Sequence, residues 1–346
     1  MMKNNFGYSI AIPAYGRPAE YKALLTSVLS MEKHPDEVII CEDHSKERHE
    51  ISKITNSFAG QFKEKNIILN YIENNVNLGY DANIRKLIHE ASFKWVILIG
   101  NDDLFLQDSL DTIDNFCTKN PDVAMVSRTF LRFKDAAENI IGTSSSFKTD
   151  TIIKNRDFSP KYIFRVCGFV GGLIVKREWA VKLETERYDG TLFYQIYLAA
   201  HAYCTKGIGY IAKPCVAARV GNPPLFGESE KDSAKHIPGS YSAEGRASMW
   251  QGVLHIAKNV GQEYNINLID DISKELSARQ AFHVFEMNVG VEKNTLKELR
   301  LKLIELGLYS NIVPKTLFTI NYIFGKNAYY FYHIARKIMQ NEKSTH

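Results

Sequence analysis

Two adjacent carboxylates, Asp102 and Asp103, come directly after the apolar run KWVILIG at 94–100. Two such groups at the end of a buried strand repel each other, so a cation or hydrogen-bond donors must compensate their charge. Carboxylate oxygens are suitable ligands for Mg²⁺ or Mn²⁺, which bind diphosphates through the same kind of oxygen. Asn-Asp-Asp is also favourable in turns and helix caps, so a purely structural interpretation stays open.

Two further apolar runs also end in polar residues. The run YSIAI at 8–12 is followed by Pro13, Ala14, Tyr15 and Arg17. The run EVIIC at 37–41 is followed by Glu42, Asp43, His44 and Ser45. Ligands of an open parallel sheet lie beyond the carboxyl ends of its strands. Acidic, aromatic and basic groups at three such ends indicate a crevice for a nucleotide with a phosphate-bound metal.

The elements that must position these residues alternate along the first 130 residues. Short apolar, β-branched runs predict strands at 8–12, 37–41, 66–72 and 94–100. Amphipathic stretches predict helices after Pro18 and over about 45–65, 80–91 and 109–119. This alternation is typical of an α/β fold with a mostly parallel sheet flanked by helices. The fully apolar run at 94–100 is predicted to be a central strand.

The later chain is less regular. A long strand is predicted at 123–133, a polar stretch without periodicity at 135–160, a glycine-containing strand at 168–177 and a helix from Thr191 to Ala202. GIGYIA at 207–212 has a GxGxxA spacing, but Pro214 follows where a dinucleotide-binding helix would begin. Residues 220–245 are rich in Gly, Pro and Ser and predict a mobile loop that folds over a ligand.

From Arg246 onward the pattern is helical. The predicted organisation is therefore a catalytic domain at 1–245 and a C-terminal helical region at 246–346. The catalytic domain divides into a nucleotide-binding half at 1–130 and an acceptor half with the mobile loop at 131–245.

Composition excludes several classes of protein. The net charge is +4 over 346 residues, and no block of five Lys or Arg occurs, so nucleic acid is not expected as a partner. The five cysteines form no CxxC pair, which favours a reducing compartment over a disulfide or zinc framework. The N-terminal apolar run ends at Pro13, so we expect neither a signal peptide nor a membrane span there, and a cytoplasmic location.

Four segments resemble, in order and spacing, the nucleotide-binding half of family 2 glycosyltransferases, which have the Rossmann-like GT-A fold. They are SIAIPAYGRP (9–18), EVIICEDHS (37–45), NNVNLGYDAN (74–83) and KWVILIGNDD (94–103). The NxGxxxN stretch and the GNDD ending are most similar to abequosyltransferase-like enzymes of bacterial surface polysaccharide synthesis, such as that of O-antigen or capsule. The resemblance implies a metal-dependent, inverting transferase of the hexosyltransferase type. It would move a sugar from a nucleotide-diphosphate donor to a saccharide or lipid-linked acceptor.

The resemblance also implies roles for matching residues. Pro13 and Tyr15 would flank the nucleobase with Ala14 and Arg17 nearby, and Asp43 would accept from a ring N–H. Asn77 and Asn83 would line the pocket near the base and phosphates. Asp102 would lie by the ribose, and Asp103 would ligate Mn²⁺ or Mg²⁺.

On the acceptor side, Gly171 and Gly172 would lie beside the sugar or form a bulge, and Arg219 would clamp the departing diphosphate. Inverting transfer needs a base for the acceptor hydroxyl. The candidate is Asp189, with Glu184 and Glu186 as alternatives; Asp189 could instead cap a helix.

Several residues depart from the family pattern. Asn101 replaces a first aspartate, Gly221 stands where a metal-binding histidine is common, and the usual Glu-Asp pair near the base is missing. These departures leave a second interpretation, a catalytically inactive relative that binds a carbohydrate or nucleotide sugar. A nucleotidyltransferase or a dehydrogenase is excluded because no glycine-rich phosphate loop follows the first predicted strand.

The segment KTLFTINYIFGKNAYYFYHIARK at 315–337 mixes aromatic and basic residues, and Gly325 to Asn327 interrupt it. Such a segment could lie on the inner face of the cytoplasmic membrane, where lipid-linked acceptors reside. The alternative is a helix packed on the catalytic domain or on a second subunit of a homo-oligomer.

Overall fold

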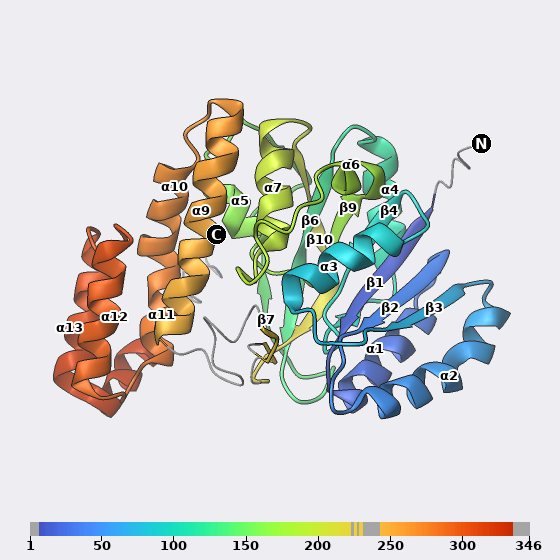
Figure 1. Ribbon diagram of the computed structural model, residues 1–346, viewed down its shortest axis with the longest axis horizontal. Helices are drawn as coiled ribbons and strands as arrows, with labels where there is room; N and C mark the ends of the chain where they lie inside the picture. The colour runs from blue at the N-terminus through green and yellow to red at the C-terminus, as the bar shows by residue number, and fades with distance from the viewer. Residues whose placement is uncertain (1–6, 223–224, 227, 231–242, 335–346) are drawn as a thin grey trace.

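The computed structural model describes residues 7–222, 225–226, 228–230 and 243–334. A twisted sheet with helices on both faces occupies one side of the molecule, and a set of C-terminal helices stands against it (Figure 1). The strands of the main path are ordered β3-β2-β1-β4-β9-β6-β10-β5, while β7 pairs with β6 and β8 with β10. This is the α/β architecture that the alternating apolar pattern predicts.

The first half consists of four parallel strands with helical connections. Their bounds are β1 Tyr8–Ala14, α1 Pro18–Leu29, β2 Glu37–Glu42, α2 Arg48–Glu64, β3 Ile68–Glu73, α3 Tyr80–Glu90 and β4 Trp95–Leu98. β1 pairs in parallel with β2 and β4, and β2 with β3. Pro18 occupies the first turn of α1, where its missing N–H costs no hydrogen bond. The four predicted strands and the helix at 109–119 are confirmed.

Alternation along β4 explains why both faces of the sheet are covered. Trp95 and Ile97 pack in one apolar cluster with side chains of α1, α2 and α4 (Ser109–Lys119). Val96 and Leu98 pack in the other cluster, with α3 and α7 (Tyr194–Cys204). All four side chains are fully buried, as expected of the central strand.

The second half makes the sheet mixed. Its elements are β5 Leu104–Phe105, β6 Met125–Phe133, β7 Ile140–Ser144, β8 Thr151–Ile153, α5 Lys161–Cys167, β9 Leu173–Lys176, α6 Arg177–Lys182 and β10 Ile208–Arg219. β9 runs antiparallel to β4 and β6, whereas β10 is parallel to β6. The stretch at 135–160 therefore contains β7 and β8. Its polar composition does not reveal them, because β7 is largely exposed and β8 has only three residues.

Two sequence-based boundaries were wrong for the same reason, a left-handed backbone. The strand predicted at 168–177 begins only at Leu173, because Gly172 has φ 83° and ends a turn. The helix predicted from Thr191 begins at Tyr194, because Leu192 has φ 63°.

The C-terminal region is helical, as predicted. It comprises α9 Ala243–Tyr264, α10 Ile269–Glu275, a π-helical turn η1 Leu276–Gln280, α11 Ala281–Met287, α12 Lys293–Glu305, α13 Ile312–Phe324 and a 3-10 turn η2 Gly325–Asn327. Side chains of α7, α9, α10 and α11 share one apolar cluster with the sheet. The division of the chain at 245 and 246 stays a prediction. Most of the predicted mobile loop at 220–245 lies outside the described residues.

Within the described ranges, every helix is too short or too polar to cross a bilayer.

Candidate active site

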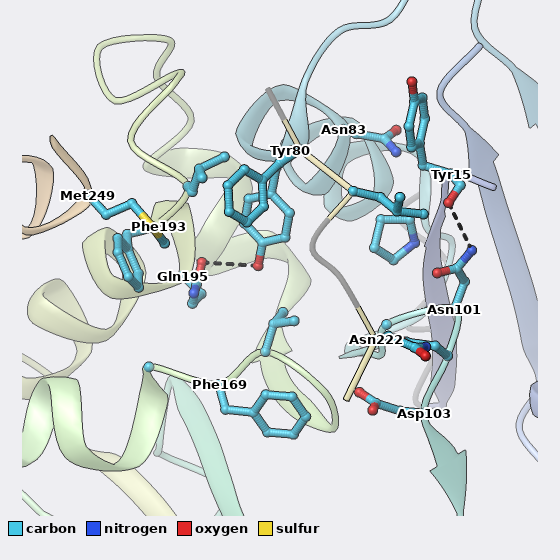
Figure 2. Close-up of a pocket in the computed structure, with 18 of the residues that line it drawn as sticks. Tyr15, Tyr80, Asn83, Asn101, Asp103, Phe169, Phe193, Gln195, Asn222 and Met249 are labelled. Carbon is cyan, nitrogen blue, oxygen red and sulfur yellow. Dashed lines mark hydrogen bonds between the residues drawn. The ribbon is translucent and has the colours of Figure 1, made fainter. Parts of the chain in front are cut away.

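A cavity of about 610 Å³ opens at the carboxyl ends of β1, β2 and β4. Nine of the residues that the sequence singles out line it: Pro13, Tyr15, Arg17, Asp43, Asn77, Asn83, Asp102, Asp103 and Arg219. Figure 2 shows Tyr15, Asn101 and Asp103 on one side of this cavity and Phe193, Gln195 and Met249 on the other. Ala14, Gly171, Gly172 and Asp189 are not among the lining residues.

Asp43 joins the end of β2 to the loop before α3. Its Oδ1 accepts hydrogen bonds from Asn74 Nδ2 at 2.7 Å and the Leu78 amide at 2.8 Å, and its Oδ2 accepts from the Gly79 amide at 3.0 Å. Burial raises the pKa of Asp43, while these donors oppose the rise. The carboxylate therefore shapes the loop that presents Asn77 to the cavity.

Asn83 belongs to the same polar cluster. Its Nδ2 donates to the Cys41 carbonyl at 3.1 Å, and its Oδ1 accepts from Asn74 Nδ2 at 3.3 Å. The side chain is buried at the base of the cavity wall, and its predicted ligand contact stays a prediction.

Asn101 has a structural task that an aspartate could not perform. Its Nδ2 donates to the Gly16 carbonyl at 2.9 Å and lies 3.4 Å from the Tyr15 carbonyl. Gly16 and Arg17 are both left-handed, with φ 61° and 58°, so this turn needs an external tether. An ionised carboxylate has no N–H to donate, which accounts for the departure from the family pattern in physical terms.

Asp102 and Asp103 point into the same region from the end of β4. Asp102 Oδ2 pairs with Arg17 and accepts from Asn222 Nδ2 at 3.1 Å. Asp103 Oδ1 accepts from the Arg219 amide at 3.1 Å, and the side chain is buried. A Cβ placed on Gly100 would lie 3.3 Å from both Asp102 Oδ1 and Asp103 Oδ2, so both oxygens approach one point.

Burial, and then repulsion from Asp102, raise the pKa of Asp103 well above its ordinary value. A site of this kind gains from a cation, which would restore the ionised form.

The donor set fits a divalent metal held jointly with a ligand. Among the residues that the structure describes, no three His, Cys, Asp or Glu side chains converge on one point. Mg²⁺, however, is commonly bound through one or two carboxylates, with phosphate oxygens and water completing its octahedron. Asp102 and Asp103 can supply that carboxylate contribution.

Gly171 lies against the acidic pair although it does not line the cavity. A Cβ at this position would be 2.3 Å from Asp103 Oδ2, so any larger residue would displace the carboxylate. Beneath it, the buried Arg128 donates to the Gly171 carbonyl and to the Phe169 carbonyl at 3.2 Å. Burial lowers the pKa of Arg128 to about 10. Sequence reasoning missed Arg128, because a single Arg within a strand carries no distinguishing signal.

Arg219 is held by the backbone around the acidic pair. Its Nη1 donates to the Asp135 carbonyl at 2.7 Å, its Nε lies 3.3 Å from the Asp102 carbonyl, and its guanidinium lies over the Phe133 ring. This places a fixed positive charge beside two carboxylates.

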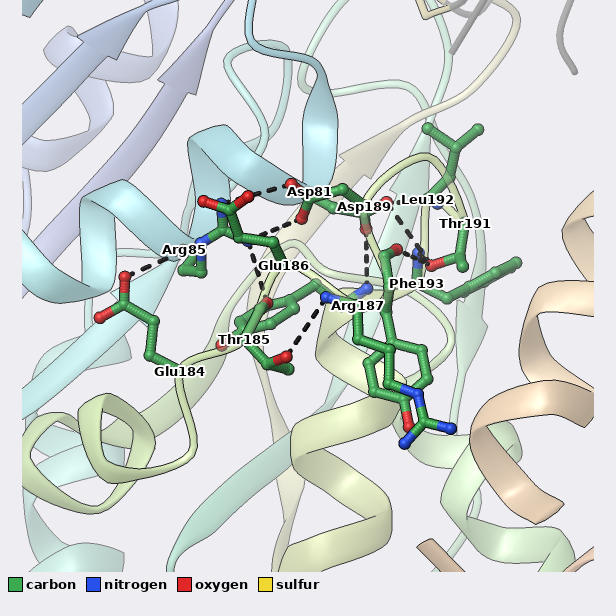
Figure 3. A network of polar contacts seen from close by, with 12 residues as sticks. Asp81, Arg85, Glu184, Thr185, Glu186, Arg187, Asp189, Thr191, Leu192 and Phe193 are labelled. Carbon is green, nitrogen blue, oxygen red and sulfur yellow. Dashed lines mark hydrogen bonds and ion pairs between the residues drawn. The ribbon is translucent and has the colours of Figure 1, made fainter. Parts of the chain in front are cut away.

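Asp189 is engaged elsewhere. Its side chain is 4% exposed and forms a bidentate pair with Arg85, at 2.7 Å from Nη1 to Oδ1 and 3.3 Å from Nη2 to Oδ2. Glu184 and Glu186 also pair with Arg85, at 3.8 and 3.5 Å (Figure 3). The structure does not bring these three acids to the other site residues, and the assignment of Asp189 as the base stays a prediction.

A second buried acid, Asp81, fixes the loop that reaches the cavity from this side. Its Oδ2 accepts from the Leu192 amide and its Oδ1 from the Tyr194 amide, both at 2.8 Å (Figure 3). These bonds hold the left-handed Leu192 and direct Phe193 and Gln195 toward the cavity. Gln195 Oε1 accepts a hydrogen bond from Tyr80 Oη at 3.3 Å across the cavity (Figure 2). Asp81, Tyr80, Phe193 and Gln195 were not among the sequence-based candidates.

Comparisons with known proteins agree with this geometry. Residues 9–172 match the family model described as Glycosyl transferase family 2. An uncharacterized glycosyltransferase of Haemophilus influenzae is 27% identical over 118 residues, which are 34% of this chain and 37% of that protein. The chain thus spans little more than a third of that relative's length.

Solved structures of S. aureus TarS residues 1–349 are similar over nearly the whole chain. The complex with UDP has a TM-score of 0.58 and 13% identity, and covers 95% of this chain and 91% of that one. The complex with UDP-GlcNAc has a TM-score of 0.57 and 13% identity, with coverage of 93% and 91%. At this identity the likeness concerns the fold. The predicted GT-A fold with a C-terminal helical region is confirmed.

Proposed function

We propose that this protein is a metal-dependent, inverting glycosyltransferase, because residues 9–172 match a glycosyl transferase family 2 domain. Its donor is a nucleoside-diphosphate sugar and its acceptor a saccharide hydroxyl. The observation that carries the proposal is the convergence of Tyr15, Asp43, Asp102 and Asp103 on one cavity at the carboxyl edge of β1, β2 and β4.

The nucleoside would occupy the end of the cavity near β1 and β2. There Tyr15 offers a ring to stack on the base, and the Asp43 loop presents Asn77. UDP sugars are the first donors to test, because the TarS structures contain UDP and UDP-GlcNAc.

The diphosphate would lie between Asp103 and the guanidinium groups of Arg17 and Arg219. When bound, Mn²⁺ or Mg²⁺ supplies a positive charge that stabilises the departing nucleoside diphosphate. Arg219 adds a fixed charge at the same place, since backbone carbonyls hold it. Gly171 leaves room for the Asp103 carboxylate beside the sugar.

The acceptor would enter from the side of Phe193 and Gln195, so that its hydroxyl attacks opposite the leaving diphosphate and inverts the anomeric centre. Asp189 is proposed as the base on the strength of the family resemblance alone. Its carboxylate would contact an acceptor only after the ion pair with Arg85 breaks, so the loop held by Asp81 would have to move.

The acceptor's origin in bacterial surface polysaccharide, through the abequosyltransferase-like subtype, is proposed from the NxGxxxN stretch at 77–83 and the GNDD ending at 100–103. A lipid-linked acceptor would place the enzyme at the inner face of the cytoplasmic membrane. Exposed apolar side chains on α12, α13 and the following residues support such peripheral contact.

The alternative function is a catalytically inactive binder of nucleotide sugars. It is favoured by one observation, the engagement of Asp189, Glu184 and Glu186 by Arg85. A binder would respond to nucleotide sugars without ever releasing the nucleoside diphosphate.

The test combines binding and turnover. Thermal unfolding is measured with UDP-, GDP-, CDP- and dTDP-sugars plus Mn²⁺; the true donor raises the melting temperature, because it binds only the folded state. Release of the nucleoside diphosphate is then followed with and without chelator. Donor-dependent stabilisation with release that Asp103→Ala abolishes supports the transferase. Stabilisation without release identifies a binder, and no response to any donor overturns both functions.

A further inference from the structure

We propose that the part of the cavity lined by α5, α9 and η1 binds an anionic group, a phosphate or a carboxylate, carried by the acceptor. The assignment of this group to the acceptor rests on the proposed function; the anion site itself rests on the arginines of this part of the cavity. Three arginines from three elements line it: Arg165 of α5, Arg246 of α9 and Arg279 of η1.

Among the described residues, Arg165 and Arg279 share a single acid. Glu275 is buried and accepts from Arg165 Nε at 3.2 Å and from Arg165 Nη2, while Arg279 Nε lies 3.9 Å from the same carboxylate. In the described part of the chain, one carboxylate thus serves two guanidinium groups, those of Arg165 and Arg279. Arg246, which has interactions of its own, lines the same cavity. Arg246 Nη2 contacts Met287 Sδ at 3.7 Å.

The donor end has the opposite balance. Arg17 pairs with Asp102, the Arg219 backbone amide donates to Asp103, and Tyr15 donates to Glu228. Among the described lining residues, the acids are Asp43, Asp102, Asp103 and Glu228, and all belong to this end. A metal-bound diphosphate would be compensated there, and Arg165, Arg246 and Arg279 are not needed for it.

The backbone at this end is built in an uncommon way. η1 is a π-helical turn between α10 and α11, and such turns occur frequently at functional sites. Its last two residues, Arg279 and Gln280, both line the cavity. The Arg279 side chain is 52% exposed, so its guanidinium is accessible to a ligand. The planar guanidinium fork matches the oxygens of carboxylates and phosphates.

The neutral part of the same ligand has a place as well. Phe193, Gln195 and Met249 line the cavity on the side opposite Asp103, and Gln195 accepts a hydrogen bond from Tyr80 (Figure 2). Aromatic and amide side chains are suited to a sugar ring. An acceptor saccharide in this position would present its hydroxyl toward Asp103 and its anionic substituent toward Arg279.

The experiment measures binding by calorimetry on the full chain saturated with UDP and Mn²⁺, which blocks the donor end. The probes are methyl glucoside, methyl glucuronide and methyl glucoside 6-phosphate. At least one of the two anionic probes should bind at least about tenfold more tightly than the neutral glycoside. The preference should shrink as salt screens the charges. Which anionic probe binds more tightly distinguishes a phosphate from a carboxylate.

Matched variants locate the site. Arg279→Gln and Arg246→Gln should each weaken the preferred anionic probe by roughly tenfold to a hundredfold and leave the neutral one unchanged. Arg279→Lys should retain part of the affinity. Arg156→Gln removes an equal charge from an exposed position outside the cavity lining and should change nothing.

Equal binding of neutral and anionic probes, absence of anion binding, or equal weakening of all probes by the Gln variants would overturn the anion site. The proposed function fails separately, through the absence of UDP-dependent stabilisation and of donor turnover in the same preparations. Anion binding would still be measurable in that event, so the two failures are distinguishable.

Discussion

At the residue scale, Asp103 shows a conflict between stability and function. Its carboxylate is buried beside Asp102, and the pKa is raised by both effects. The folded state therefore favours the protonated form. Stability from this group is fully present below the ordinary carboxyl pKa and is lost as the pH rises through the raised, folded-state pKa.

Asp103→Asn should remove this loss. With chelator present, the variant should unfold at a higher temperature than the wild type at pH 8, and the difference should shrink as the pH falls toward 4. Sugar transfer should fall by at least about a hundredfold, the scale of losing one electrostatic contact to the transition state. Equal melting temperatures across the pH range would show that Asp103 carries no buried charge.

Asn101 supports a second prediction at the same scale. Asn101→Asp restores the acid common in the resembling family, yet it replaces the donor to the Gly16 carbonyl with an acceptor. We expect the free energy of unfolding to fall by about 1–3 kcal/mol. UDP affinity should fall too, because the turn carrying Tyr15 loses its tether.

Denaturant unfolding and UDP titration check this prediction. Asn139→Asp makes the same charge change at an exposed site and should be neutral. A stability equal to that of the wild type in Asn101→Asp would contradict the tether.

At the scale of elements, the loop from Tyr188 to Tyr194 depends on Asp81 at the start of α3. The carboxylate accepts two backbone N–H groups, which have few alternatives in a buried environment. Helix α3 thereby positions the loop that carries Phe193 into the cavity, although the two are more than a hundred residues apart.

In Asp81→Asn the side-chain oxygen can still accept from one of the two backbone amides. The side-chain NH₂ group then faces the other amide, and that hydrogen bond is lost. We expect a loss of about 1–3 kcal/mol in unfolding free energy. The acceptor KM should rise more than the donor KM, because the loop borders the acceptor side. Asp111→Asn, which changes a helix acid outside the cavity lining, is the control. Equal rises in both KM values would indicate a general loss of structure instead.

At the scale of the whole molecule, the end of the C-terminal region combines apolar and basic surface. Ile312, Ile323, Tyr329, Tyr330 and Ile334 are each more than half exposed. Between 293 and 334 the basic residues Lys293, Lys297, Arg300, Lys302, Lys315 and Lys326 outnumber the acids Glu298 and Glu305. Apolar side chains with surrounding cations are complementary to an anionic lipid surface.

The full chain should therefore float with phosphatidylglycerol-containing vesicles and not with pure phosphatidylcholine vesicles, and salt should weaken the association. Ile323→Ser and Tyr330→Ser should each reduce binding several-fold, since they remove inserted apolar area. Ile68→Ser, at a half-exposed apolar position on β3, is the control. A vesicle-independent dimer that both serine variants dissociate would assign this surface to a second copy of the chain instead.

The fold of the first half could be predicted from the sequence. Each β/α unit there has a local period, and parallel strands place their carboxyl ends at one edge, so the convergence of Tyr15, Asp43 and Asp103 follows from order alone. Composition also indicated the helical C-terminal region, because its apolar spacing is local as well.

Tertiary structure decided the remainder, because contacts between distant segments have no local sequence pattern. Asp189 pairs with Arg85, more than a hundred residues earlier, and this pairing rather than its own neighbourhood decides where its carboxylate points. Helix α7 begins only after Leu192, because the backbone of Leu192 is left-handed and its amide is bound by Asp81 of α3. Arg165, Arg246 and Arg279 come from three elements and share one cavity wall only once α5, α9 and η1 have packed together.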